Sequence, residues 1–305
     1  MIVKVLGSAA GGGFPQANCN CRNCADVRAG KPGLRRRMQS SLAVSPDGVR
    51  WVLLNASPDL RQQIEATPEL APRGDHGLRS SPIAAAVLTN GDVDHVAGLL
   101  SLREGFAFGL YASERVLAIL AANPIFNVLD RSRVSRVPLP LDKGIEVMPG
   151  LRIEAFAVPG KVALYMEDET AGPSLGTQAG DTLGLKVSDA SSGSAFFYIP
   201  GCAAVDSSLA GRVSGAALVL FDGTLYTDDE LIAQGLSAKT GKRMGHISMA
   251  GPDGSMAAFE TLGVKRRIYV HMNNSNPVLR EDGPERAAVE RAGWEVAHDG
   301  MEIRL

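Results

Sequence analysis

The sequence predicts an α+β fold built from two β-rich halves that pack together with helices on the outside. Short β-rich runs separated by turn signals recur through both halves of the 305 residues. Helical patterns follow these runs without the regular strand–helix alternation of a doubly wound sheet. No linker rich in Pro, Gly or Ser divides the chain, so we expect a single domain over residues 1–305.

The first half opens with a strand at residues 2–6, which alternate in polarity. Residues 41–44 and 49–54 flank Ser-Pro-Asp-Gly, a hairpin turn signal. Residues 83–88 are continuously apolar, as in a strand that is covered on both faces. Helical spacing follows at residues 96–102 and 113–122.

The second half repeats this pattern. Strands are expected at residues 151–158, 182–187, 195–199, 216–221 and 268–271, helices at 253–262 and 284–291, and a closing hairpin at 295–304. The polar, Gly-containing stretch 167–180 is expected to form a long surface loop and is a candidate lid.

Composition and motifs exclude several classes of protein. A net charge of -2 without clustered positive charge argues against nucleic-acid binding. No apolar stretch approaches the ~20 residues that cross a bilayer, and Lys4 interrupts the opening segment where a signal peptide needs a continuous apolar core. We therefore expect no membrane insertion and a cytoplasmic location. The chain also lacks a dinucleotide fingerprint, a phosphate loop and a Gly-x-Ser-x-Gly nucleophile elbow.

Three of the four cysteines, Cys19, Cys21 and Cys24, fall within six residues. Disulfide frameworks spread their cysteines to close loops, whereas thiolates gathered this tightly converge on one ion. Soft thiolates select zinc, and a structural zinc takes four ligands, so a fourth comes from elsewhere in the chain or from water. The alternative of three buried reduced cysteines fits poorly beside the asparagines at 18, 20 and 23. The cluster therefore predicts a structural zinc.

A second candidate metal site follows the strand expected at 83–88. The chain there presents Asp92, Asp94 and His95 before a helical segment, at a strand end where ligands usually bind. The alternative for Asp94 is a helix N-cap. His271 ends another apolar run, where a structural role is the alternative to metal binding. His246 lies on a loop expected to open a helix, which suits a polar binding role.

Residues 89–98, Thr-Asn-Gly-Asp-Val-Asp-His-Val-Ala-Gly, resemble the metallo-β-lactamase superfamily signature Thr-His-x-His-x-Asp-His-x-x-Gly. The Thr, Asp, His and Gly of the signature are retained. Asn90 and Asp92 stand where its first two histidines belong.

Two later strand ends that resemble this superfamily also depart from it. Lys161, in Val-Pro-Gly-Lys, replaces another metal histidine, and Cys202, in Ile-Pro-Gly-Cys, replaces the aspartate that bridges two ions. The resemblance places Asp94, His95 and His271 in the remaining metal site. A two-metal hydrolytic centre needs both sets of ligands. Two histidines and one carboxylate match a non-haem iron(II) oxygenase, but they also bind zinc, and the ligand count does not decide between the two.

Further motifs along the whole chain resemble the B-protein family of pyrroloquinoline quinone (PQQ) biosynthesis. They are the opening Gly-Ser-Ala-Ala-Gly-Gly-Gly-Phe-Pro-Gln, the cysteine cluster, Asp222-Gly-Thr-Leu-Tyr, Met244-Gly-His-Ile-Ser and His271-Met-Asn-Asn-Ser-Asn-Pro. The resemblance implies a metallo-β-lactamase fold, a four-layer αββα sandwich. It also implies oxygen-dependent hydroxylation of the tyrosine ring in a cross-linked Glu-Tyr unit that derives from a ribosomally made peptide.

We therefore expect an iron-dependent hydroxylase whose active-site divalent metal, iron(II), is held by Asp94, His95 and His271. Asp92 would enlarge the coordination sphere. One alternative, also attached to the family, is a carrier that moves PQQ or its precursor to the periplasm. The other is a hydrolase that retains a single zinc. Expected partners are the Glu-Tyr substrate, free or peptide-derived, and other PQQ biosynthesis proteins, and the oligomeric state is left open.

The remaining site residues are assigned by the same resemblance. Asp222 and His246 would accept phenolic protons or orient a carboxylate, and Lys161 would neutralise a substrate carboxylate. In a phosphodiesterase relative with the same cysteine cluster, a histidine three residues after the last metal histidine completes the zinc site. That position is Asn274 here, and an amide is a weaker zinc ligand. The link would tie the cysteine loop to the segment that bears His271.

Overall fold

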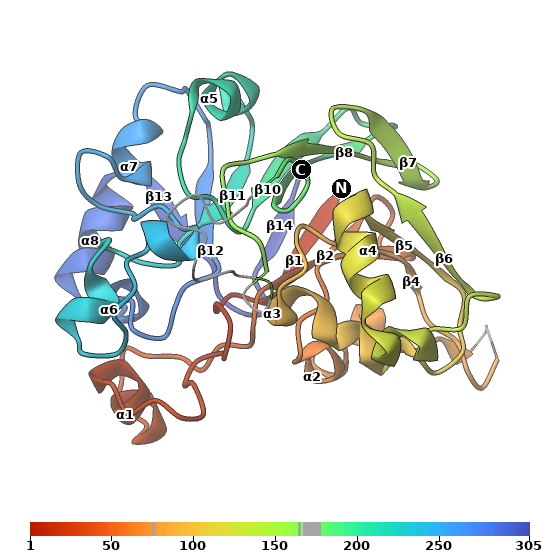
Figure 1. The fold of residues 1–305 in the computed structure, drawn as a ribbon, viewed down its shortest axis with the longest axis horizontal. Helices are drawn as coiled ribbons and strands as arrows, with labels where there is room; N and C mark the ends of the chain where they lie inside the picture. Colours follow the sequence, from red (N-terminus) through yellow and green to blue (C-terminus); the bar gives the residue numbers. More distant parts are fainter. Residues whose placement is uncertain (75–76, 164–165, 167–177) are drawn as a thin grey trace.

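Two mixed sheets packed face to face form the centre of the computed structural model, which describes residues 1–74, 77–163, 166 and 178–305. Within these residues each sheet has seven strands, and helices cover both outer faces (Figure 1). In spatial order the first sheet contains β14 (Glu302–Arg304), β1 (Ile2–Gly7), β2 (Ser41–Ser45), β3 (Trp51–Leu54), β4 (Ile83–Val87), β5 (Phe108–Ala112) and β6 (Val134–Pro138). The second contains β13 (Trp294–Val296), β12 (Arg267–Val270), β11 (Val219–Asp222), β10 (Ala195–Ile199), β9 (Leu183–Asp189), β8 (Leu151–Ala157) and β7 (Gly144–Met148).

The two sheets share one pairing pattern. Strands β14, β1, β2 and β3 pair antiparallel, and β3 to β6 pair parallel. In the second sheet β7 to β10 pair antiparallel, and β10 to β13 pair parallel. Because parallel strands end at the same sheet edge, each sheet collects several strand-following loops along one edge.

Short helices connect the strands. The α-helices are α1 (Arg22–Arg28), α2 (Leu60–Glu65), α3 (Val93–Val96), α4 (Glu114–Ala122), α5 (Ser207–Val213), α6 (Glu230–Ala233), α7 (Ser255–Ala258) and α8 (Pro284–Arg291). The described 3₁₀ turns include η1 (Pro68–Leu70), η3 (Ala97–Leu102), η4 (Pro124–Val128), η6 (Lys242–Met244) and η7 (Pro277–Leu279). Among the described residues, none of the helices has the length and apolar character needed to cross a bilayer.

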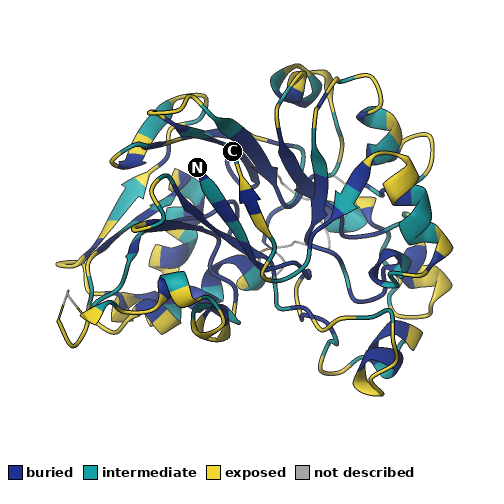
Figure 2. Cartoon of the chain, turned by 180° about the vertical axis from the view of Figure 1, so that it is seen from behind, coloured by how far each residue is buried: buried dark blue, intermediate teal, exposed yellow. Residues whose placement is uncertain are grey.

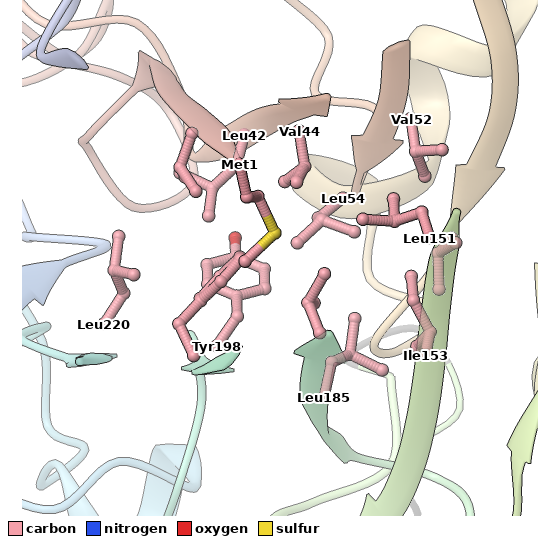
Figure 3. Packing of buried hydrophobic residues seen from close by; sticks show 14 of the residues in the cluster. Met1, Leu42, Val44, Val52, Leu54, Leu151, Ile153, Leu185, Tyr198 and Leu220 are labelled. Atoms are coloured by element: carbon pink, nitrogen blue, oxygen red, sulfur yellow. The ribbon is translucent and has the colours of Figure 1, made fainter. Parts of the chain in front are cut away.

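Three apolar clusters separate the four layers. The central cluster lies between the sheets and includes Leu54, Ile153, Leu185, Tyr198 and Leu220 (Figure 3). A second cluster joins the outer face of the first sheet to α2 and α4, and a third joins the outer face of the second sheet to α5 and α8. The inner strands of each sheet are largely buried on both faces, whereas exposed residues gather on the outer helices, the loops and the edge strands (Figure 2). The αββα sandwich that the resemblance implied is confirmed.

Alternation along the strands explains how one strand serves two clusters. In β3, Val52 and Leu54 face the central cluster, while Trp51 and Leu53 face the helices. This is the period of two that a pleated strand imposes. Because both faces are covered, both sets of positions are apolar.

Several expected elements need correction. The closing hairpin at 295–304 is wrong, because β13 pairs with β12 in the second sheet and β14 pairs with β1 in the first. The expectation of no strand–helix alternation is also wrong, since β3, β4, β5 and β6 run parallel with short helices between them. The helix expected at 253–262 is only the single turn α7. Most of the loop expected at 167–180, residues 167–177, lies outside the described residues.

Candidate metal centre

Loops from the two sheets bring two histidines and a carboxylate together. Asp94 and His95 lie on α3, which follows β4 of the first sheet, and His271 follows β12 of the second. One possible ligand atom of each lies within 4.8 Å of the others. Asp94 Oδ2 is 3.0 Å from His271 Nε2, and the imidazole rings of His95 and His271 stack with centroids 5.2 Å apart. The main chain at His271 has a φ of 61°, a left-handed conformation that ends the strand here.

His95 provides a test of whether these residues suit a metal ion. The residue is buried, and neither of its ring nitrogens has a hydrogen-bond partner. Its Nδ1 is 3.6 Å from Asp94 Oδ1, which is too long for a hydrogen bond. Burial lowers the pKa of His95, so the ring is neutral and keeps a lone pair. A buried imidazole without partners is destabilising, and a bound cation would satisfy it, so the three residues fit a divalent metal.

The electrostatics favour an anionic Asp94. Burial by itself would raise the pKa of Asp94, but the adjacent His95 and His271 outweigh it and hold that pKa well below its ordinary value. Burial would lower the pKa of His271, but the hydrogen bond and charge of Asp94 raise it on balance. The carboxylate therefore stays ionised and available as a metal ligand.

A second group of side chains lies beside the first and shares His271. Asp222, His246 and His271 also offer ligand atoms within 4.8 Å of one another. Asp222 is fully buried at the end of β11, and its Oδ2 is 2.7 Å from His246 Nδ1. The side chain of His246 is 17% exposed, so it is the member of this pair that solvent or a ligand can reach. Burial would raise the pKa of Asp222, but His246 lowers it on balance.

Thr224, which the sequence did not single out, connects the two groups. Its hydroxyl lies 2.6 Å from Asp222 Oδ1, 2.9 Å from His271 Nδ1 and 3.1 Å from His246 Nδ1. Its backbone N–H also donates to Asp222 Oδ1 over 3.0 Å. A single threonine carries no chemical signal in a sequence, and only the fold places this one.

The other expected residues lie around these groups. Asp92 occupies the N-cap of α3, the position considered for Asp94, and it belongs to none of the possible metal-binding groups among the described residues. The side chain of Lys161 lies against Gly245, the residue before His246. A Cβ added at Gly245 would lie only 2.9 Å from the Cγ of Lys161. Cys202 is buried, which raises the pKa of its thiol, and its Sγ donates to the carbonyl of Ala204 over 3.0 Å.

The three clustered cysteines form a separate group. The Sγ atoms of Cys19, Cys21 and Cys24 lie within 4.8 Å of one another, and all are free thiols. Asn274 Nδ2 lies 3.1 Å, 3.6 Å and 3.4 Å from them, respectively. A half-turn of this amide would place Oδ1 at the same point, so an amide oxygen and three thiolates can face one ion. Burial raises the pKa of Cys24 to about 11, and a bound cation would favour its thiolate.

Comparison with known proteins covers the whole chain. Residues 50–272 match the family described as the Beta-lactamase superfamily domain. The chain is 52% identical to coenzyme PQQ synthesis protein B of Methylorubrum populi over 305 residues, covering 100% of both chains. It is 53% identical over 307 residues to the protein of that name in Xanthomonas euvesicatoria pv. vesicatoria, again covering 100% of both.

Solved structures agree with these relatives. The chain superposes on Zn(2+)-bound PqqB from Methylobacterium extorquens with a TM-score of 0.96 and 51% identity, covering 100% of each chain. A diphosphatase of the PhnP family matches with a TM-score of 0.67 at 20% identity, covering 100% of this chain and 97% of the other. The second likeness shows the fold alone.

Proposed function

The chain belongs to the coenzyme PQQ synthesis protein B family of the metallo-β-lactamase superfamily, and from this membership we propose that it is a metal-dependent hydroxylase in PQQ biosynthesis. Its substrate would be the tyrosine ring of a cross-linked Glu-Tyr unit. The native active-site metal would be iron(II).

One observation carries this proposal: of the two sets of ligands in the superfamily signature, the chain keeps only the set of two histidines and one carboxylate that serves one ion. Asp94, His95 and His271 lie together, while Lys161 and Cys202 stand where the resemblance expects ligands of a second ion. A bound iron(II) with this ligand set would supply oxygen activation at its open positions. A two-metal hydrolytic centre, in contrast, needs both sets of ligands.

The Asp222–His246 pair suits proton transfer from a phenol. His246 Nδ1 donates to Asp222 Oδ2, so Nε2 of the neutral ring carries a lone pair. The buried carboxylate fixes the ring and stabilises the imidazolium that forms when Nε2 accepts the phenolic proton. Lys161, which lies against the neighbouring Gly245, would hold a carboxylate of the substrate beside this base. Asp92, at the start of α3, would add a weaker ligand or a hydrogen-bond acceptor.

The cysteine cluster would hold a structural zinc with Asn274 as its fourth ligand. Asn274 is three residues from His271, and this segment bridges back to the loop after β1, where Met272 N donates to the carbonyl of Ser8. The zinc would therefore fix the segment that positions an active-site ligand.

The decisive experiment is a single-turnover mass measurement. Protein freed of its active-site metal is loaded with iron(II) without oxygen and mixed with the tyrosine-containing intermediate, and oxygen and ascorbate are then admitted. We expect the substrate to gain one or two oxygen atoms with iron and none with zinc. Binding without a mass change would instead favour the carrier. Conversion by the zinc-loaded protein without oxygen would favour a single-zinc hydrolase.

Variants separate the two metal sites. His271→Ala should abolish oxygen insertion while the zinc of the cysteine cluster remains. His298→Ala is the matched control, because His298 belongs to none of the possible metal-binding groups among the described residues. Activity that survives His271→Ala would refute the ligand assignment.

A further inference from the structure

The hydroxyl of Thr224 is the only contact that joins the buried carboxylate of Asp222 to His271 among the described hydrogen bonds. Thr224, Asp222 and His271 are 4%, 0% and 3% exposed, so water cannot substitute for a missing partner at low cost. The available hydrogens in this buried network can therefore be counted.

The carboxylate of Asp222 accepts four hydrogen bonds. Asp222 Oδ2 accepts from the backbone N–H of Cys202 over 2.9 Å and from His246 Nδ1 over 2.7 Å. Asp222 Oδ1 accepts from the backbone N–H of Thr224 over 3.0 Å and from its hydroxyl over 2.6 Å. An ionised carboxylate only accepts, and a hydroxyl–carboxylate contact this short is charge-assisted.

The hydroxyl of Thr224 has one hydrogen to donate. Its acceptor is Asp222 Oδ1, or alternatively the carbonyl oxygen of His271 at 3.1 Å. In either case no hydrogen is left for His271 Nδ1, 2.9 Å away, so that nitrogen must be the donor. The opposite assignment would leave two oxygens facing each other over 2.6 Å without a hydrogen.

We propose that Thr224 is a positioning residue that holds His271 in the Nδ1–H tautomer, which leaves Nε2 as the nitrogen that binds the active-site metal. This inference rests on the metal role proposed for His271. Without a metal, His271 Nε2 donates to Asp94 Oδ2 over 3.0 Å, and a bound ion would take the place of that hydrogen, so the ring orientation already aims Nε2 at the other proposed ligands. Asp222 thereby orders both histidines, His246 directly and His271 through one hydroxyl.

The first test needs no variant. In zinc-loaded protein with ¹⁵N-labelled histidine, long-range ¹H–¹⁵N correlation spectra should show the hydrogen of His271 on Nδ1. The signal is assigned by its loss in His271→Ala. A hydrogen on Nε2 would overturn the proposal, and this result does not depend on how any threonine variant folds.

The second test measures iron(II) affinity by anaerobic competition with a chromophoric chelator. Thr224→Val keeps the branched shape but removes the hydroxyl, and it should weaken binding by roughly 10–100-fold. Thr224→Ser keeps the hydroxyl and should bind close to wild type, and both variants should retain the zinc of the cysteine cluster. Equal affinity in Thr224→Val and wild type, or equal weakening in both variants, would overturn the proposal. The iron(II) affinities of wild type and the two variants could follow the expected order while wild type adds no oxygen to the substrate. In that case the proposed function fails and the role of Thr224 stands.

Discussion

The buried amide of Asn23 is expected to stabilise the protein because it fastens α1 to the segment that follows β12. Asn23 is 5% exposed, and its Nδ2 donates to the carbonyl oxygens of Asn274, Ser275 and Asn276 at 3.2, 3.2 and 2.9 Å. Two N–H hydrogens serve three acceptors, so Asn23→Ala removes two net hydrogen bonds rather than three.

The stability lost in Asn23→Ala depends on the hydrogen bonds that the three carbonyl oxygens still accept from other donors. Ser275 O still accepts from Gln234 Nε2, and Asn276 O still accepts from Leu279 N. The full penalty of stranded buried carbonyls therefore does not apply, and two net hydrogen bonds at about 0.5–1.5 kcal/mol each give a loss of about 2 kcal/mol. That lowers the folded-to-unfolded ratio by roughly 30-fold.

The assay is urea unfolding of the zinc-loaded protein, with Asn20→Ala as the matched control. Asn20 is an exposed asparagine just before α1 with no side-chain hydrogen bond among the described contacts, so its substitution should change stability by no more than about ±0.5 kcal/mol. Asn23→Ala should also lose zinc to a chelator faster, since Asn274 is then held less firmly. Equal stability of the two variants would refute this account of the segment.

Four further predictions concern packing, pH and metal content. Gly98→Ala should destabilise the protein by at least ~2 kcal/mol, because its Cβ would lie 2.0 Å from a backbone carbonyl oxygen. Gly211→Ala in α5, where a Cβ meets open space, should raise thermal stability by up to ~1 kcal/mol, and a loss there would contradict the reasoning. Burial raises the pKa of Glu230 to about 7, so its protonated form stabilises the fold at low pH and this contribution is lost as pH rises through 7. Urea titrations from pH 5 to 8 should therefore show Glu230→Gln gaining on wild type by up to ~3 kcal/mol, and a constant difference would exclude the effect. Elemental analysis should find zinc lost from Cys24→Ser and kept in Cys202→Ser, since only the first thiol faces the cysteine cluster.

The sequence reveals strands more readily than it reveals their partners. The run at residues 83–88 could be recognised because β4 is covered on both faces and is therefore apolar at every position. The sequence predicted a closing hairpin at residues 295–304, but Asp299 in its turn accepts from Ser8 N, Ser8 Oγ and Met38 N. These bonds fasten the turn to the end of β1, so the chain crosses from one sheet to the other. Local turn chemistry alone does not indicate this long-range choice.

Residue type likewise predicts some of the site and misses the rest. Cysteines, histidines and aspartates attract notice because few other residues bind metals, and the structure does bring Asp94, His95 and His271 together. Thr224 had no such signal, because threonine is common and its importance depends on a hydroxyl that lies between Asp222 and His271. The roles assigned to these residues stay predictions until the experiments above are done.

The three proposed ligands follow strands of two different sheets, and this arrangement has a consequence for how the protein would acquire its metal. Asp94 and His271 are 177 residues apart in the chain, so the site is complete only once the segments that bear them have come together. A partly folded chain holds only the neighbouring Asp94 and His95, too few ligands to retain an ion firmly. With this ligand set, firm metal binding would require both sheets to have docked. By then the finished geometry and the supply of metals, rather than the intrinsic affinity order of the ions, determine which one is taken.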